Sequence, residues 1–273
     1  MVAEITDSGA AGVDRSTLPF VAPCRDVPAS APLRWLRLGW QDLRRAPGQS
    51  LVYGAIIALL SIIVTAIGLR LGSYWAVLIL LSGFVFVAPV LALGLYSISR
   101  QIERGDAPSC RRCLRELRLC LGTAMVFALA LLVVFLIWMR AGSLVHVFFP
   151  DNATTHWSEL LAFFAIGSAV GSLFVALTFV FSAFSLPMIS DRDTDAITAI
   201  VTSVNAVLRN KRTMLVWALL IVALTALAFA TAMLGMAVIM PVLGHATWHA
   251  YRETIDASAW PALNPILPAQ ETP

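Results

Sequence analysis

The chain has 273 residues, of which 59% are hydrophobic and only 13% are charged. A soluble domain has roughly 45–50% apolar and about 25% charged residues, so this composition excludes an ordinary soluble protein. The formal net charge of +3 is too small to indicate a nucleic-acid-binding protein. We interpret the sequence as that of an all-α membrane protein that crosses the bilayer several times.

The first thirty residues contain acidic residues, prolines and small residues but no apolar core. A signal peptide needs a basic start followed by an apolar stretch, so none is predicted here. We expect residues 1–30 to form a disordered tail and residues 256–273 to form a second one. Residues 31–255 are then expected to be a single membrane domain.

Long apolar stretches predict the membrane spans, because about 20 apolar residues cross a hydrocarbon core of about 30 Å. Four clear spans cover residues 50–69, 74–99, 120–139 and 160–189. The stretch from 214 to 250 is too long for one span, and we divide it into two helices with a tight turn at residues 231–235. One long tilted helix is the alternative, and it would give five spans with the C-terminus on the opposite side.

The basic residues predict the orientation of these spans. They are concentrated before the first, third and fifth spans and after the last, at Arg34, Arg37, Arg44, Arg45, Arg100, Arg104, Arg111, Arg112, Arg115, Arg118, Arg192, Arg209, Lys211, Arg212 and Arg252. The intervening loops hold only Arg70 and Arg140. Because positive residues favour the cytoplasmic side, we predict six spans in a bacterial inner membrane with both termini in the cytoplasm.

A weak internal repeat organises the six spans. The segments "LRWLRLGWQDLR", "CRRCLRELRLCL" and "ITAIVTSVNAVL" each precede a pair of spans and carry apolar residues at matching helical positions. Amphipathic segments of this kind are typical of helices that lie at the headgroup level. In the first and last units, Pro89 aligns with Pro241, Tyr96 with Trp248, and Arg100 with Arg252. We predict three hairpin units, residues 33–105, 106–193 and 194–255, each with an interfacial helix in front.

Two histidines four residues apart, His245 and His249, share one face of the last predicted helix. A metal helix of the H-E-x-x-H type also supplies a glutamate and a third ligand, and neither is present here. Three hypotheses follow: polar, partly solvated residues at a helix exit, a metal or haem site, and a contact with a partner or lipid. We favour the first and predict no metal and no cofactor. The candidate interaction surface is His245, Trp248, His249, Tyr251 and Arg252.

Two other patterns resemble metal sites. Cys110 and Cys113 could join the histidines in a tetrahedral zinc site, but with Cys120 they fall on the apolar face of their helix, so we expect packing residues. The stretch "SDRDTD" lacks the glycine and the distal glutamate of a calcium loop. We expect Asp193 or Thr194 to cap the following helix instead.

The stretches "RQIERGD", "FSLPMISDRD" and "PVLGHATWHAYR" carry a family resemblance. With them, the chain resembles an uncharacterised family of bacterial integral membrane proteins, domain of unknown function 2189, over about residues 33–252. The resemblance implies a six-span inner-membrane protein and assigns no functional residues.

The basic amphipathic faces, and the near absence of ionisable groups at mid-span, favour a non-enzymatic scaffold or accessory of a membrane complex. Its expected partners are the lipid bilayer and a membrane protein complex, with no nucleic acid. A small transporter or permease is the alternative, because of the repeat and of the proline in each even-numbered span. A third hypothesis is a metal- or haem-associated respiratory accessory protein built on His245 and His249.

Overall fold

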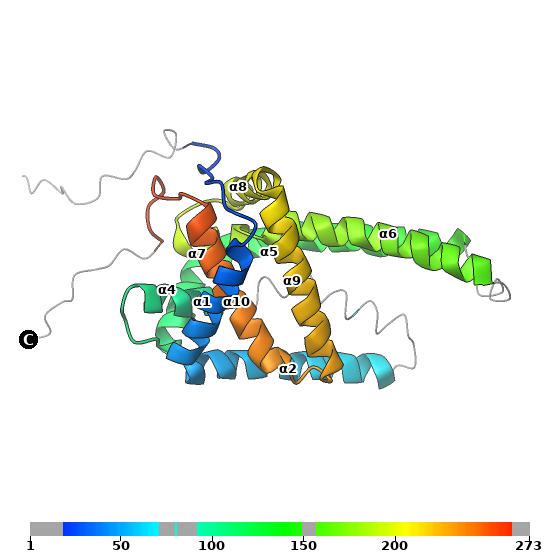
Figure 1. The fold of residues 1–273 in the computed structure, drawn as a ribbon, viewed down its shortest axis with the longest axis horizontal. Helices are drawn as coiled ribbons and strands as arrows, with labels where there is room; N and C mark the ends of the chain where they lie inside the picture. Colours follow the sequence, from blue (N-terminus) through cyan, green and yellow to red (C-terminus); the bar gives the residue numbers. More distant parts are fainter. Residues whose placement is uncertain (1–18, 71–79, 81–91, 149–156, 264–273) are drawn as a thin grey trace, which may run out of the picture.

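In the computed structural model, residues 19–70, 80, 92–148 and 157–263 are described. They are helical apart from turns, extended segments and two isolated β-bridges, so the predicted all-α class is confirmed for this part of the chain. The helices are α1 (Ala31–Arg45), α2 (Pro47–Arg70), α4 (Leu93–Glu103), α5 (Cys110–Phe148), α6 (Trp157–Ser182), α7 (Ser185–Asp191), α8 (Ala196–Arg209), α9 (Lys211–Ala230) and α10 (Met236–Thr254). Figure 1 shows their arrangement.

Four stretches are long and apolar enough to cross a membrane, namely Pro47–Arg70, Cys110–Gly142, Leu161–Asp191 and Lys211–Ala230. They contain the first, third, fourth and fifth predicted spans. Most of the second predicted span, residues 74–99, lies outside the described residues, and α4 is its described end. The sixth predicted span corresponds to α10, which is not among the four.

The chain reverses between α9 and α10. Ala232 and Met233 have φ angles of 52° and 67°, in the left-handed region that breaks a right-handed helix. The backbone N–H of Gly235 then donates to Thr231 Oγ1 at 2.8 Å and closes the turn. The predicted turn at residues 231–235 is confirmed, and the alternative of one long tilted helix is wrong.

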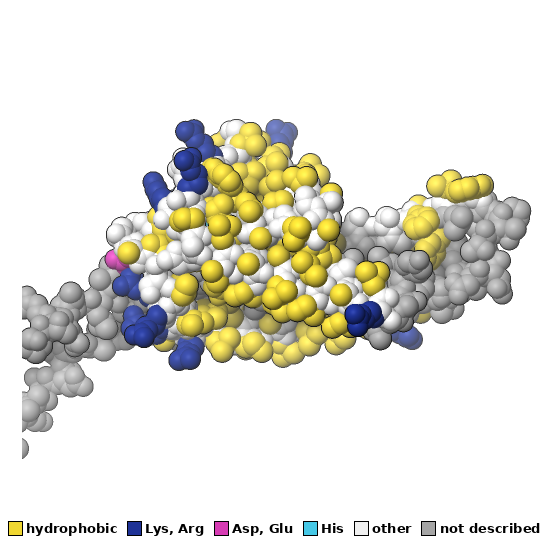
Figure 2. All heavy atoms as spheres, turned by 90° about the horizontal axis from the view of Figure 1, so that it is seen from below, with side chains coloured by type: hydrophobic (Ala, Val, Ile, Leu, Met, Phe, Trp, Pro, Cys, Tyr) yellow, Lys and Arg dark blue, Asp and Glu magenta, His cyan; other side chains and the backbone are white. Residues whose placement is uncertain are grey.

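The four candidate spans turn large apolar side chains outward. Well-exposed examples are Val52, Leu59 and Ile67 on α2, Met125 and Leu129 on α5, Phe164 and Leu173 on α6, and Leu215 and Leu219 on α9. Figure 2 shows such an apolar face, with Lys and Arg side chains around its edges, several of them at the end of the molecule where α1 and α4 lie. Contiguous exposed apolar area of this extent is typical of a surface covered by lipid.

Helix α8 exposes large apolar side chains and buries hydroxyl groups, which is unusual for a helix in water. Ile197 and Leu208 are 63% and 53% exposed, whereas Thr202 and Ser203 are fully buried. The buried hydroxyls hold neighbouring segments: Thr202 Oγ1 accepts from the N–H of Ala22, and Ser203 Oγ donates to the carbonyl of Val180. The predicted apolar stripe of this segment is therefore split, with part of it facing outward.

The junctions between amphipathic segments and spans differ. Before α2, Ala46 has φ −130° and ψ 58°, because the following Pro47 disfavours helical backbone at the preceding residue. Before α9, Asn210 is also non-helical. The second amphipathic segment contains no such break, and α5 continues from Cys110 through the span as one helix of 39 residues. The separate interfacial helix predicted for the unit 106–193 is wrong.

Helix α10 packs between α1, α2, α4 and α9 (Figure 1). Two glycines allow the backbones to meet. A Cβ atom on Gly39 of α1 would lie 2.6 Å from the carbonyl oxygen of Val242, and one on Gly54 of α2 would lie 2.0 Å from that of Ala237. Only glycine permits approaches this close. The last helix of the described residues is therefore the one around which α1, α2, α4 and α9 are packed.

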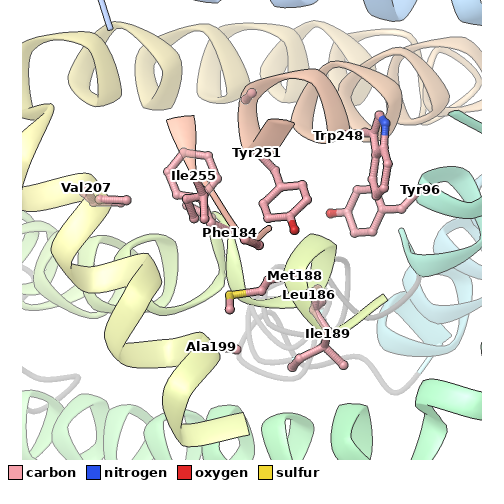
Figure 3. Packing of buried hydrophobic residues seen from close by; sticks show 14 of the residues in the cluster. Tyr96, Phe184, Leu186, Met188, Ile189, Ala199, Val207, Trp248, Tyr251 and Ile255 are labelled. Carbon is pink, nitrogen blue, oxygen red and sulfur yellow. The ribbon is translucent and has the colours of Figure 1, made fainter. Parts of the chain in front are cut away.

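The ends of α4, α7 and α10 meet in the main apolar core. Figure 3 shows Tyr96 of α4 beside Trp248 of α10, with Tyr251 of α10 above Leu186 and Met188 of α7. All of these side chains are buried. Three segments far apart in the sequence thus form one core at one end of the molecule.

Parts of the predicted tails are ordered. The N–H of Val27 donates to Asn210 Oδ1 at 2.9 Å, and Thr213 Oγ1 donates to the carbonyl of Val27 at 2.6 Å. At the other end, Trp260 is buried and the carbonyl of Pro261 accepts from the N–H of Asp193. Predicted disorder is therefore wrong for residues 19–30 and 256–263, because polar groups at helix ends and in loops elsewhere in the chain satisfy their backbones. Residues 1–18 and 264–273 lie outside the described residues.

Candidate functional site

His245 lies in the interior, fully buried in the C-terminal half of α10. Its Nε2 atom is 3.0 Å from Ser50 Oγ at the start of α2, and its Nδ1 atom is 2.7 Å from Ser99 Oγ on α4. The prediction that His245 is a partly solvated side chain at the end of a span is therefore wrong. The physical reason is that α1, α2 and α4 all close over the same face of α10.

Asp42 of α1 joins the two histidines. Its Oδ2 atom accepts from Ser99 Oγ at 2.9 Å and is 2.8 Å from His249 Nε2. Asp42 is buried, while the His249 side chain is 21% exposed. The sequence carried one signal for this residue: Asp42 falls on the same helical face as Trp35 and Gly39, both of which are buried.

The hydrogen-bond directions in this cluster follow from proton counting. The Ser99 hydroxyl has one proton and donates it to Asp42, so the Ser99 oxygen accepts from a protonated Nδ1 of His245. The Nε2 atom accepts from the Ser50 hydroxyl when the ring is neutral and donates to the Ser50 oxygen when the ring is protonated. Both nitrogens of His245 therefore have a partner within the protein. Among the described residues no group of three or more His, Cys, Asp or Glu side chains could hold a metal ion.

A second buried cluster joins α4, α5 and α7. Arg100 Nη2 is 2.6 Å from Glu116 Oε2, and both side chains are buried. Ser97 also donates to Glu116, Gln101 donates to Ser97 at 3.1 Å, and Arg100 donates to the carbonyl of Ser190. Hydrogen bonds of this kind are what make a buried ion pair tolerable.

A third cluster holds the end of α10. Trp248 Nε1 donates to Glu103 Oε2 at 2.9 Å, and Arg252 Nε donates to Glu103 Oε1 at 3.1 Å. The Tyr251 hydroxyl donates to Asp191 Oδ2 at 3.0 Å. The first and third clusters thus join α10 to α1, α2, α4 and α7.

The predicted interaction surface is therefore mostly interior. His245, Trp248 and Tyr251 are buried, and only Arg252 and part of His249 remain exposed. The prediction is wrong because neighbouring helices supply a carboxylate to this face at Asp42, Glu103 and Asp191. The pattern of aromatic and polar residues reflects packing between helices rather than an outer surface.

The other predicted residues have mixed outcomes. Cys113 and Cys120 are buried as expected, but Cys110 is exposed.

The predicted cap of α8 is wrong by one or two positions. Asp195, rather than Asp193 or Thr194, accepts from the N–H of Thr198 at 2.9 Å and caps the helix. Partial burial of Asp195 works against ionisation, but the hydrogen bonds from the first turn of α8 outweigh it and lower the pKa of this carboxyl.

Residues 77–191 match the model of a family described as predicted integral membrane protein (DUF2189). The predicted resemblance is confirmed over this part of the chain, which includes α4, α5, α6 and α7. Arg100, Glu116 and Asp191 lie within it, whereas Asp42, His245 and His249 lie outside. No match was found among curated proteins or among solved structures.

Proposed function

We propose that this chain, in which residues 77–191 belong to a family of predicted integral membrane proteins, is a non-enzymatic scaffold or accessory subunit of a membrane complex. One observation carries the proposal: among the described residues, the Ser50–His245–Ser99 group is closed off from solvent. Ser50, Ser99 and His245 are fully buried and hydrogen-bonded to one another. A catalytic base or nucleophile must reach a substrate, and these groups bind neighbouring helices instead.

The division of the molecule supports the same role. At one end, the polar clusters fasten α1, α2, α4, α5, α7 and α10 together. Around it, the spans keep apolar faces that lipid or the helices of a partner can cover. A rigid centre with apolar faces around it suits a protein that positions other membrane proteins.

We infer the topology from the same observations: six crossings in three diverged units, with both termini in the cytoplasm of a bacterial inner membrane. The turn at residues 231–235 and the meeting of α4, α7 and α10 support it. The outward apolar side chains of α8 support an interfacial helix before the last unit.

Cysteine labelling tests this topology. Single cysteines at residues 234 and 258 of a cysteine-free variant should react with a membrane-impermeant maleimide from opposite sides of the membrane. Labelling of both from one side would contradict six crossings.

The scaffold role is testable by photo-crosslinking in intact membranes. A photoreactive amino acid in place of Leu129 or Ile197 stands on an exposed apolar face, and one in place of Trp217 is the buried control. We expect one protein to be cross-linked reproducibly from an exposed position and none from Trp217. If every exposed position on α2, α5, α6, α8 and α9 gave only lipid adducts, the scaffold proposal would fail.

A transporter is the second candidate, and the buried ionisable groups favour it. Asp42 and Glu116 lie in the interior beside His245 and Arg100, and ion-coupled carriers place such groups between helices. Purified protein in vesicles that contain a pH-sensitive dye would test this. A proton leak that exceeds protein-free vesicles and is lost in His245→Ala would support transport. A leak equal to that of protein-free vesicles would reject a proton-coupled carrier.

A further inference from the structure

Three arginines of α5 differ from most other exposed arginines. Arg25, Arg34, Arg112, Arg209 and Arg252 are exposed but each pairs with an Asp or Glu. Arg111, Arg115 and Arg118 are exposed and have no hydrogen-bond or ion-pair partner within the described residues. They are positively charged side chains that pair with no acidic group in the described part of the fold.

The three arginines form one stripe with the lipid-facing side of α5. Positions 111, 115, 118, 122, 125 and 129 follow the spacing of one helix face, and all are exposed. The opposite face, with Cys113, Glu116, Cys120, Ala124 and Phe127, is buried in the core. Because α5 is continuous, its outer face changes from arginine to apolar side chains within two turns.

The position of the stripe along α5 matches the headgroup layer. The apolar part of α5 from Leu119 to Met139 rises about 30 Å, the thickness of a hydrocarbon core. The arginines occupy the two turns just before it, about 10 Å of helix. Arginine stems lie along apolar surface while the guanidinium reaches the phosphates, so all three side chains can reach that layer.

From this geometry we propose that Arg111, Arg115 and Arg118 form a binding surface for anionic phospholipid headgroups. A guanidinium binds a phosphate oxygen pair through two parallel hydrogen bonds. Three unpaired guanidiniums on one face select a lipid with net negative charge, because a zwitterionic headgroup brings its own cation. The inference requires that α5 be in a membrane, but it does not depend on the scaffold role.

The test measures lipid selectivity around the full chain in vesicles of phosphatidylcholine. Trace spin-labelled phosphatidylglycerol or phosphatidylcholine reports, by electron paramagnetic resonance, how strongly each lipid associates with the protein. We expect an approximately fivefold preference for the anionic lipid. The ratio of anionic to zwitterionic lipid association should fall toward one as the salt concentration rises from about 0.1 M to 1 M. The reason is that the Debye screening length decreases from about 10 Å to about 3 Å over this range. A wild-type protein without the preference, or with one that salt does not change, would overturn the proposal.

Variants locate the preference. The triple variant R111Q/R115Q/R118Q should lower it to less than about twofold, whereas R111K/R115K/R118K should keep most of it. The variant R25Q/R34Q/R209Q removes the same charge from arginines that are already paired, and should keep the wild-type preference. Retention in the glutamine triple variant, or equal loss in the paired-arginine control, would contradict the proposal. If the glutamine triple variant fails to fold, a wild-type preference that salt does not lower still overturns the proposal.

One further measurement separates this proposal from the scaffold role. Cross-linking from position 197 on α8 should be the same in the wild type and in R111Q/R115Q/R118Q, since the two sites are on different helices. Loss of a protein cross-link at α5 without any loss of lipid preference would mean that the stripe binds an acidic protein, and the lipid proposal would be wrong.

Discussion

Two regions of the molecule are held together in different ways. The polar head, defined here as α1, α4, α7, residues 110–120 of α5 and the C-terminal half of α10, is rich in buried hydrogen bonds and ion pairs. The rest of the α5–α6 hairpin leaves most of its apolar side chains exposed, and Gly167 and Gly171 of α6 have no atom within 4 Å of an added Cβ. In lipid, apolar exposure costs little, so the hairpin can rely on its own backbone hydrogen bonds. The head must instead satisfy buried polar groups with one another.

The largest test of this contrast is the buried ion pair. Glu116→Ala leaves the Arg100 guanidinium buried without its carboxylate, and we expect a loss of about 3–5 kcal/mol in the free energy of unfolding. Denaturant unfolding in detergent micelles measures it. The double variant R100M/E116L should recover most of the loss. If Glu116→Ala cost less than about 1 kcal/mol, as an exposed pair does, the pair would not be buried.

A matched pair of glycine substitutions comes next. Gly54→Ala places a methyl group against the carbonyl of Ala237, and we expect a loss of about 2–3 kcal/mol from forced separation of α2 and α10. Gly167→Ala on α6 meets nothing, and should be neutral or stabilise by up to about 1 kcal/mol through helix propensity. Thermal unfolding in micelles compares them. Equal effects of the two substitutions would show that α2 does not approach α10 so closely.

Removal of the acid that joins the histidines should have a smaller effect. Asp42→Ala leaves the Ser99 hydroxyl and His249 Nε2 without their acceptor, and we expect a loss of about 2 kcal/mol. Asp106→Ala removes an exposed partner of Arg112 and should cost less than about 1 kcal/mol. Amide hydrogen exchange would show whether the loss is local. Faster exchange in α6 than in α4 after Asp42→Ala would argue against a separate polar head.

The smallest predicted effect concerns the cap of α8. Asp195→Ala should cost about 1 kcal/mol by leaving the Thr198 N–H without its acceptor. Since folding lowers the pKa of Asp195 from its ordinary value of 3.8, its contribution is present above that pH and is lost as the pH falls through the folded value. The difference in stability between wild type and Asp195→Ala should therefore shrink in acid. A difference that grew in acid would contradict the sign of this pKa shift.

The sequence predicted those features that depend on local pattern. The apolar runs gave four of the spans, and the break at residues 231–235 followed from the length of the last run. The continuity of α5 was missed because an amphipathic pattern does not itself mark a helix end. At the other two junctions, Pro47 and Asn210 supply the break.

The polar clusters could be predicted only in part, because a sequence shows the faces of helices but not which faces meet. The spacing of His245 and His249 shows that the two histidines share one helix face. Their partner Asp42 lies on α1, more than two hundred positions away along the chain. The buried acid was visible as a charged residue on the face of Trp35 and Gly39, yet nothing in the sequence pairs it with α10.

The central place of α10 has a consequence for biogenesis. Gly39, Asp42, Ser50, Gly54 and Ser99 all precede α10 in the chain and all face it. During synthesis these groups enter the membrane or its surface long before their partners emerge from the ribosome. The nascent protein therefore waits in an open form, with carboxylate and hydroxyls uncovered, until the last helix arrives and seals it. Interrupted translation products would remain open, and this exposes them to membrane proteases that degrade unfinished chains.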